Sequence, residues 1–214
     1  YAVVAYQTAY LKRHYPREFM AALLTSVLDN TGKVIEYTAE CQRMGIRVLP
    51  PDINASDAGF TVEGKDIRFG LLALKNVGRN LIATVVRERS GTPYRSLYDF
   101  CKRLHGTEIN RRAVESMIKS GAFDNLEAKR RYMMDGVEGI LKSVESEARR
   151  NLDGQIDLFG ALDGEQESGR NVYKLPDSGE EYPYDILLQM EKEVSGLYLS
   201  GHPLDHYRPV IEEV

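Results

Sequence analysis

The sequence of 214 residues has little cysteine and no long apolar run, and each absence excludes a class of protein. Its apolar stretches are interrupted by charged side chains and never approach the roughly 20 residues that cross a bilayer. Cys41 and Cys101 are too few for a disulfide framework and lack zinc-ligand spacing, which suits a reducing compartment. No signal peptide or lipidation motif is present. We therefore expect a cytoplasmic protein without a membrane partner.

Patterns typical of catalytic sites are also missing. The sequence contains no Asp-x-Asp pair that would suggest a two-metal site, no glycine-rich phosphate loop and no nucleophile elbow. None of the four histidines has metal-ligand spacing with either cysteine; they are His14, His105, His202 and His206. We expect no catalytic residue, no metal site and no cofactor in this chain. Because it starts at Tyr1 within a predicted helix, we expect it to be a piece of a larger protein.

Charge is unevenly distributed along the chain. The formal net charge is -4, but residues 1–120 carry 18 Lys and Arg against 12 Asp and Glu. Residues 121–214 carry 10 against 20. The basic excess is greatest in 65–120, with 12 basic and 5 acidic side chains. Only this part of the chain is suited to a polyanion such as nucleic acid.

Hydrophobic periodicity predicts a mainly α fold that begins with a small helical array. Helices are expected over 1–14, from Pro16 onward, and from a cap at Asn30 or Thr31 to a terminator at Gly45. The tyrosines at 1, 6, 10, 15 and 37 are expected to pack within it. Residues 46–51 read as extended, and 60–69 as a β-hairpin around Gly64.

The rest of the chain is predicted to form short helices, a linker and a last helix. Helices are expected over 70–75, 79–89, 96–104 and 110–120, followed by a longer one over 127–150. Residues 151–185 contain nine acidic side chains, two basic ones and five glycines, which favours a flexible acidic linker. A C-terminal helix is expected over 186–199.

The residues around Val77 have the pattern of a helix-hairpin-helix, in which two short helices flank a turn with a central apolar residue. Val77 would anchor the turn, while Asn76 and Gly78 would tolerate unusual backbone angles. Amides at the start of the second helix would then favour a phosphate. The predicted contacts are Lys75, Asn76, Val77, Gly78, Arg79 and Asn80. A tight turn between two core helices is the alternative interpretation, and Asn76 stands where the motif usually has glycine.

A second helix pair is predicted over 96–121. Arg111 and Arg112 fall in the first turn of its second helix, where cations are locally unfavourable. An external anion would explain them, and we include Lys119 with them as a predicted DNA contact; solvated surface positions screened by salt are the alternative. Two such pairs could follow the phosphates of both strands of a duplex without reading bases.

An apolar island lies within the acidic linker, where it has no local core to enter. A glutamine followed three and four residues later by Leu-Phe is the pattern of a peptide that docks on the sliding clamp of replication machinery. The predicted clamp-binding residues are Gln155, Ile156, Asp157, Leu158 and Phe159.

Four segments carry a resemblance to a known family. They are YQTAYLKRHYPREFMAALLTS at 6–26, MGIRVLPPDIN at 44–54, IKSGAFD at 118–124 and GLYLSGHPLD at 196–205. The chain resembles the bacterial DNA polymerase III alpha subunits, which are replicative C-family polymerases.

The resemblance implies a domain plan and a set of partners. It places the end of the fingers at 1–64, a tandem helix-hairpin-helix at 65–126, a supporting helix at 127–150, a linker with the clamp motif at 151–185, and a helix leading to the next domain at 186–214. It implies duplex DNA, the sliding clamp and other replisome subunits as partners. The catalytic palm with its Mg²⁺ would lie outside this chain, so the parent protein would be a polymerase and this segment alone inactive.

Two alternatives from other functional classes remain open. One is a non-enzymatic helix-hairpin-helix module of a repair or recombination factor. The other is a structural piece whose basic surface faces protein or solvent.

Overall fold

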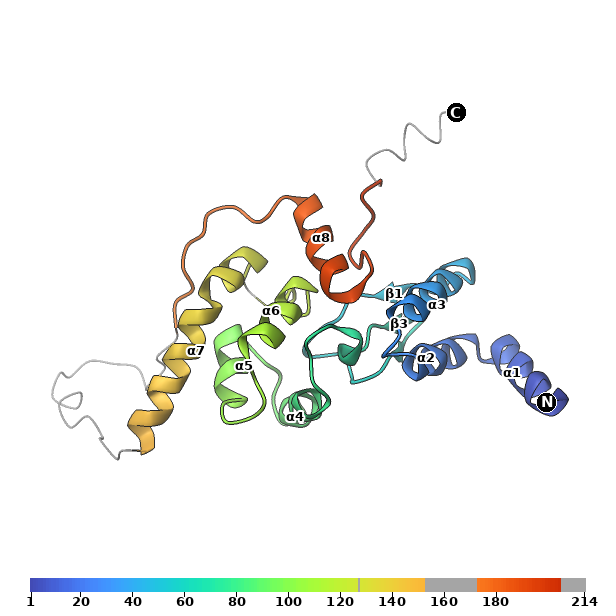
Figure 1. Cartoon of the computed structure of the whole chain (residues 1–214), viewed down its shortest axis with the longest axis horizontal. Helices are drawn as coiled ribbons and strands as arrows, with labels where there is room; N and C mark the ends of the chain where they lie inside the picture. Colours follow the sequence, from blue (N-terminus) through green and yellow to red (C-terminus); the bar gives the residue numbers. More distant parts are fainter. Residues whose placement is uncertain (127, 153–172, 205–214) are drawn as a thin grey trace.

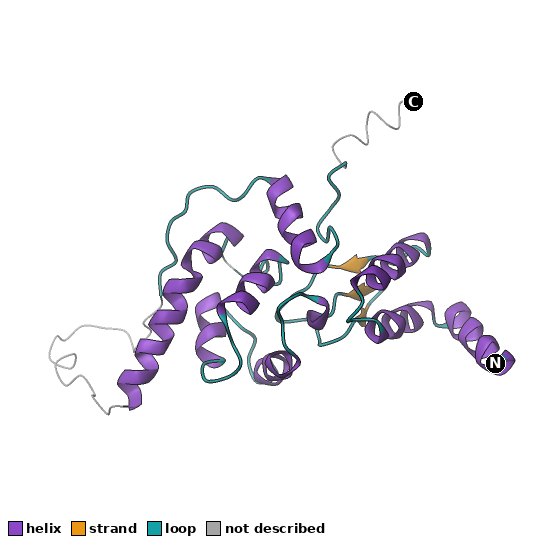
Figure 2. Cartoon of the chain, in the orientation of Figure 1, coloured by secondary structure: helices purple, strands orange, loops and turns teal. Residues whose placement is uncertain are grey.

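The computed structural model describes residues 1–126, 128–152 and 173–204, and it confirms a mainly α fold with a small sheet (Figures 1 and 2). Helices α1 (Ala2–His14), α2 (Pro16–Ser26) and α3 (Thr31–Arg43) form the N-terminal array. Pro16 opens α2, and the Asn30 side chain caps α3 by accepting a hydrogen bond from the Lys33 amide at 3.0 Å. The predicted starts of these helices are therefore confirmed.

Helix α1 differs from the prediction, because it buries none of its residues. Tyr1, Tyr6, Tyr10 and Tyr15 are all exposed, so the expectation that they pack in a core is wrong. The spacing of the apolar residues correctly predicted a helix with an apolar face. Spacing alone does not show whether another element packs on that face. Figure 1 shows α1 at one end of the molecule, beside α2 and away from the other helices.

The sheet contains the predicted hairpin and one pairing that was not predicted. Strands β2 (Thr61–Glu63) and β3 (Asp66–Arg68) are antiparallel around Gly64, whose φ of 61° is in the left-handed region. Strand β1 (Val48–Leu49) pairs parallel with β3, which lies at the centre of the sheet. Together these strands connect the helical array to the basic region.

The basic region folds into short helices close to the predicted limits. A 3₁₀ turn η1 (Leu71–Ala73) precedes α4 (Arg79–Arg89), α5 (Leu97–Arg103) and α6 (Arg111–Lys119). The long helix α7 (Arg130–Leu152) and α8 (Tyr184–Ser195) pack against α6. One continuous core extends from α2 to α8 and includes both thiols. Burial raises the pKa of Cys41 to about 11 and of Cys101 to about 12, so both are inert core side chains.

The described end of the predicted linker is packed along α7, which corrects the expectation that all of 151–185 is free. Tyr173 stacks on Tyr98 with ring centroids 6.4 Å apart, and Leu175 lies against Gly136. The glycines of α7 leave room for this close approach, so they accommodate the crossing segment as well as lowering helix propensity. We call residues 173–183 the strap; it connects to α8 across the top of Figure 1.

No helix in the described residues is both long and apolar enough to cross a membrane.

Candidate nucleic-acid interface

The first hairpin is formed by η1, a turn and α4. Leu74 is buried at the start of the turn and Val77 is half-buried, which confirms that apolar side chains anchor it. Asn76 has a φ of 62° and is the only non-glycine residue with positive φ among the described residues. Gly78 has an ordinary extended backbone with φ -84° and ψ 152°. The unusual backbone angle therefore falls on Asn76 alone.

Substitutions at Asn76 should separate its backbone role from its side chain. Asn76→Val should lower the free energy of unfolding by about 1–2 kcal/mol, because a β-branched residue is strained in the left-handed region. Asn76→Gly should leave the free energy of unfolding nearly unchanged. Glycine removes the backbone strain, which offsets the loss of the hydrogen bond from the side-chain Nδ2 of Asn76 to Ser116 Oγ at 3.2 Å. Urea unfolding monitored by circular dichroism measures both. Equal stability of the two variants would contradict this account of the turn.

The start of α4 is open to an anion. Gly78 is the N-cap and has no side chain to satisfy the first amides of the helix, which carry its positive dipole end. A carboxylate from elsewhere lies there instead: Glu108 Oε1 accepts a hydrogen bond from Asn80 Nδ2 at 2.8 Å. Glu108 Oε2 is 3.7 Å from the position that a Cβ on Gly78 would take. The Glu108 carboxylate therefore lies beside the start of α4 and binds the Asn80 side chain.

The second helix pair is closed by the predicted caps. Ser96 Oγ accepts from the Asp99 amide at 3.1 Å, and the Asn110 side chain accepts from the Ala113 amide at 3.0 Å. Gly121 follows α6 with a φ of 82°, as a helix terminator should. The hydrogen bonds from Asn76 to Ser116 and from Asn80 to Glu108 join the first turn to the second pair. The two hairpins therefore form one unit.

The predicted DNA-binding cations are not equally available. Arg111 makes ion pairs with Glu115 at 2.6 Å and with Glu138 of α7 at 2.8 Å. Its position at a helix start therefore has an internal explanation and no longer requires an external anion. Arg112 is exposed and makes no hydrogen bond or ion pair within the part of the chain that the structure describes. Of the two arginines, Arg112 is the freer to meet a phosphate.

The two lysines of the predicted set are held by the last turn of α8. Lys75 Nζ donates to the backbone oxygen of Glu193 at 2.7 Å, and the Lys75 amide donates to the Val194 oxygen at 2.9 Å. Lys119 Nζ lies 2.8 and 3.0 Å from the two carboxylate oxygens of Glu193. Cations at this end of a helix also interact favourably with its dipole. Both lysines thus help dock α8 on the hairpins.

Arg79 is the most exposed of the paired cations in the first hairpin. Its contact with Asp29 is 3.5 Å long, and the two side chains are 72% and 92% exposed. A pair of this kind contributes little to stability and is easily replaced. Arg79 and Arg112 are therefore the predicted contacts that the fold leaves most accessible.

Comparison with known proteins agrees with this geometry. A family model described as a helix-hairpin-helix motif matches residues 45–133, which include both hairpins. The DNA polymerase III subunit alpha of Saccharopolyspora erythraea is 47% identical over 209 residues, which cover 96% of this chain and 17% of that protein. The corresponding subunit of Escherichia coli K12 is 42% identical over 214 residues, covering 99% and 18%. That of Xylella fastidiosa Temecula1 is 44% identical over 218 residues, covering 100% and 18%.

The chain belongs to the DNA polymerase III alpha subunit family. It spans less than a fifth of the length of these relatives.

Within this DNA polymerase III alpha segment, a buried charge cluster fixes α8 against the hairpins. Arg130 is 4% exposed, and its guanidinium makes two hydrogen bonds with Asp124, at 2.8 and 2.5 Å, and one with Glu191 at 2.9 Å. Glu191 is fully buried and also accepts from the amides of Leu199 and Ser200 at 2.8 and 3.0 Å. Burial alone would lower the pKa of Arg130, but Asp124 and Glu191 outweigh it, and the pKa is raised.

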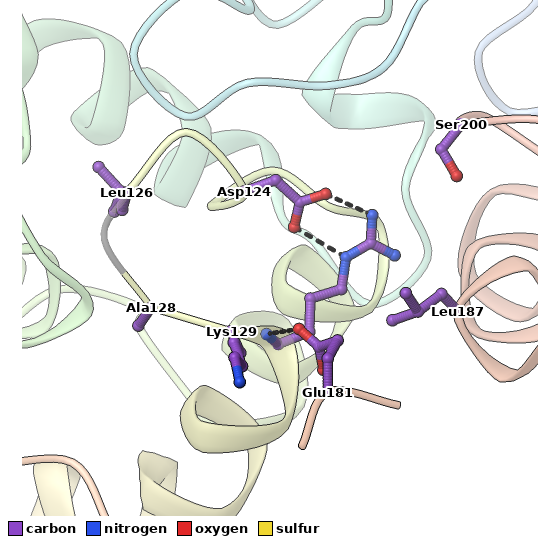
Figure 3. Close-up of a pocket in the computed structure, with 8 residues that line it drawn as sticks. Asp124, Leu126, Ala128, Lys129, Glu181, Leu187 and Ser200 are labelled. Atoms are coloured by element: carbon purple, nitrogen blue, oxygen red, sulfur yellow. Dashed lines mark hydrogen bonds and ion pairs between the residues drawn. The ribbon is translucent and has the colours of Figure 1, made fainter. Parts of the chain in front are cut away.

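A pocket of about 440 Å³ lies beside this cluster, between the loop that follows α6, the start of α7, the strap and α8 (Figure 3). Figure 3 shows Asp124 bound to the guanidinium of Arg130 and Glu181 of the strap bound to the first amide of α7, with Leu187 of α8 beside them. Asp124 and Arg130 are thus paired with each other, Glu181 accepts from the backbone amides of α7, and Lys129 Nζ donates to the Gly179 oxygen at 3.3 Å. The pocket therefore lies at a joint between the loop after α6, the strap, α7 and α8.

The predicted clamp motif at 155–159 lies outside the described residues. Leu152, the last residue of α7, precedes it, and Tyr173 of the strap, which follows it, contacts the same helix at Gly139. The described residue before the motif is therefore the end of α7, and the described residue after it packs against the same helix. Within the described ranges, no group of three or more His, Cys, Asp and Glu side chains is arranged to hold a metal ion.

Sequence reasoning missed the acidic partners of the site. Glu108, Glu138 and Glu193 carry no motif. Glu138 and Glu193 pair with cations from other elements, and Glu108 accepts from the Asn80 side-chain amide. Only Glu115, four residues after Arg111 on the same helix, has a spacing that predicts its pairing.

Proposed function

We propose that this segment grips duplex DNA through its two hairpins and tethers a replicative DNA polymerase to a sliding clamp through Gln155–Phe159. The observation that carries the proposal is the open start of α4, where a helix end without a side-chain cap follows a left-handed turn at Asn76 and is flanked by the exposed Arg79. The basic excess of residues 65–120 supports it, since sequence-independent binding depends on phosphate neutralisation.

The clamp contact would act together with the DNA grip. A short peptide binds the clamp weakly alone. When the hairpins hold a duplex that the clamp encircles, the clamp is held close to the peptide, so its effective concentration at the peptide is high. Avidity of this kind gains on the order of 100- to 10,000-fold without new contacts. The attachment of both flanks of the motif to α7, which packs on α6, supports such coupling.

Catalysis would belong to the parts of the polymerase outside this segment, in the palm with its Mg²⁺, and the other replisome subunits would contact the longer protein. Residues 1–64 would be the end of the fingers. We infer a cytoplasmic setting from the similarity to the DNA polymerase III alpha subunits of bacteria.

Neutralising Arg79, Arg111 and Arg112 together should weaken duplex binding equally for all sequences. In a plot of the logarithm of the binding constant against the logarithm of salt concentration, each lost phosphate contact should reduce the steepness of the slope by about one. Fluorescence anisotropy with duplexes of unrelated sequence at several salt concentrations measures both effects. The single variant Arg112→Gln should account for more of the loss than Arg111→Gln, because Arg111 is already held by two glutamates.

A matched triple variant, Arg13→Gln, Arg43→Gln and Arg149→Gln, removes the same charge at exposed positions of α1, α3 and α7. It should change affinity much less. Equal losses in the two triple variants would show that net charge and not the hairpins holds the duplex. Unchanged affinity at low salt in the hairpin variant would contradict the proposed site.

A further inference from the structure

The strap lies along α7 and begins with an aromatic contact. Tyr173 lies against Gly139 of α7, and its ring stacks on Tyr98 of α5. Leu175 then lies against Gly136, one turn earlier on α7. Because α5 and α7 also pack directly on each other, the start of the strap contacts both members of this helix pair.

The other end of the strap caps the start of α7. The carboxylate of Glu181 accepts hydrogen bonds from the amides of Arg130 and Arg131, at 2.7 and 3.0 Å. Amides at a helix start have no partner within the helix, so this carboxylate satisfies them. The guanidinium of Arg130 in turn donates to the backbone oxygen of Lys119, the last residue of α6, at 3.2 Å. The strap is therefore connected to the second hairpin through a residue that it caps.

The contacts of the strap favour its release. Its apolar anchors, Tyr173 and Leu175, are only half-buried. Its polar contacts include exposed ones, such as the hydrogen bond from Lys129 Nζ to the Gly179 oxygen at 3.3 Å. Segments with few buried apolar contacts and exposed hydrogen bonds open locally, at a lower free energy than the whole fold. A weakly held segment thus caps a helix start whose Arg130 is 4% exposed.

We propose that the strap is a latch on the duplex grip, which holds α7 against the hairpins when docked and loosens the hairpins when released. This rests on the proposed duplex grip. In the docked state, Glu181 fixes the start of α7 and, through Arg130, the end of α6. The start of α6 also depends on α7, because Arg111 pairs with Glu138 at 2.8 Å. Release lets α7 shift against α6, so the hairpins no longer meet both phosphate strands in register. The strap is a positioning element and does not itself contact DNA.

Gly139→Ala tests the latch, because a Cβ at this position would collide with the hydroxyl oxygen of Tyr173. Alanine favours a helix more than glycine does, so α7 itself should not be weakened. Hydrogen exchange followed by mass spectrometry should show faster exchange at the amides of Arg130 and Arg131, which the docked strap protects. Duplex affinity, measured by fluorescence anisotropy, should fall about three- to tenfold.

Tyr173→Phe provides the rescue, because it removes the hydroxyl oxygen and keeps a ring to stack on Tyr98. Combined with Gly139→Ala, it should restore most of the exchange protection and most of the duplex affinity. A general disturbance of α7 would not be repaired in this way. The matched control is Gly91→Ala, where an added Cβ has no atom within 4 Å. It should leave both measurements unchanged.

The outcomes separate the latch from the proposed function. If the unmodified chain does not bind duplex, the proposed function fails and the latch fails with it. If the chain binds through the hairpin arginines, but Gly139→Ala exposes the two amides without loss of affinity, the latch is wrong and the grip stands. If the amides stay protected in Gly139→Ala, the strap is a fixed part of the fold and the latch is again wrong. A loss of affinity that Tyr173→Phe does not reverse also contradicts the latch, and a loss that it reverses supports it.

Discussion

Arg130→Met should lower the free energy of unfolding by about 3–5 kcal/mol, because it leaves a buried carboxylate without its cation. Glu191 is 0% exposed and would retain only the amides of Leu199 and Ser200 and its local contacts. Asp124 would lose both of its hydrogen bonds to the guanidinium. The measurement is urea unfolding followed by circular dichroism, in which the midpoint should fall with little change in slope.

The neighbouring arginine provides the control for this prediction. Arg131→Met removes the same charge one residue along, where the side chain donates to the Glu180 oxygen at 3.2 Å in an exposed contact. Arg131→Met should lower the free energy of unfolding by well under about 1 kcal/mol. A double variant, Arg130→Met with Glu191→Gln, should recover much of the loss, since glutamine can still accept from the two amides without burying an unpaired charge. If Arg130→Met costs no more than Arg131→Met, the cluster does not stabilise the fold.

The same cluster explains why α8 belongs to one unit with the two hairpins. Arg130 also donates to the backbone oxygen of Lys119 at 3.2 Å, so it connects α6, α7 and α8 at one point. Lys75 and Lys119 add the contacts with the end of α8. We therefore expect these lysines to act first as anchors for α8, and Arg79 and Arg112 to act more directly on phosphate.

Elements whose signals are local could be predicted from the sequence. The caps at Asn30, Ser96 and Asn110 each accept from an amide three residues ahead, so a window of four residues contains the whole interaction. The left-handed glycines at 45 and 121 end their helices for an equally local reason. The turn at Asn76 belongs to the same class, because a short polar residue tolerates that backbone region.

Features that depend on distant partners could not be predicted. The exposed face of α1 has the same periodicity as a buried one, and only the folded arrangement shows what lies against it. The polar composition of the strap predicts a flexible segment. In the structure Tyr173 stacks on Tyr98 and packs against Gly139 of α7. The basic residues of the site were visible in the sequence, but their acidic partners were not: Lys75 and Glu193 are 118 residues apart, and Arg111 and Glu138 are 27 apart.

Replacing Leu158 and Phe159 with alanine should abolish binding to the sliding clamp and leave duplex binding unchanged. In the docking pattern, the Leu-Phe pair fills an apolar pocket of the partner, and buried apolar anchors of this kind carry most of the energy of a small interface. Surface plasmon resonance with the clamp immobilised measures the first effect, and duplex anisotropy of the same variant measures the second. The reason for independence is that the grip depends on α4, α6 and their surrounding charges, none of which this change touches.

Leu162→Ala is the matched control, because it shortens a leucine in the same segment but outside the pattern. It should bind the clamp as the unmodified chain does. If clamp affinity survives the Leu158 and Phe159 change, the assignment of the motif is wrong, whatever the hairpins do. If Leu162→Ala binds as weakly as the double variant, general apolar character and not the pattern makes the contact. Adding a primed duplex threaded through the clamp then tests the tether itself: the unmodified chain should gain on the order of 100-fold or more over either contact alone, and the double variant should gain nothing.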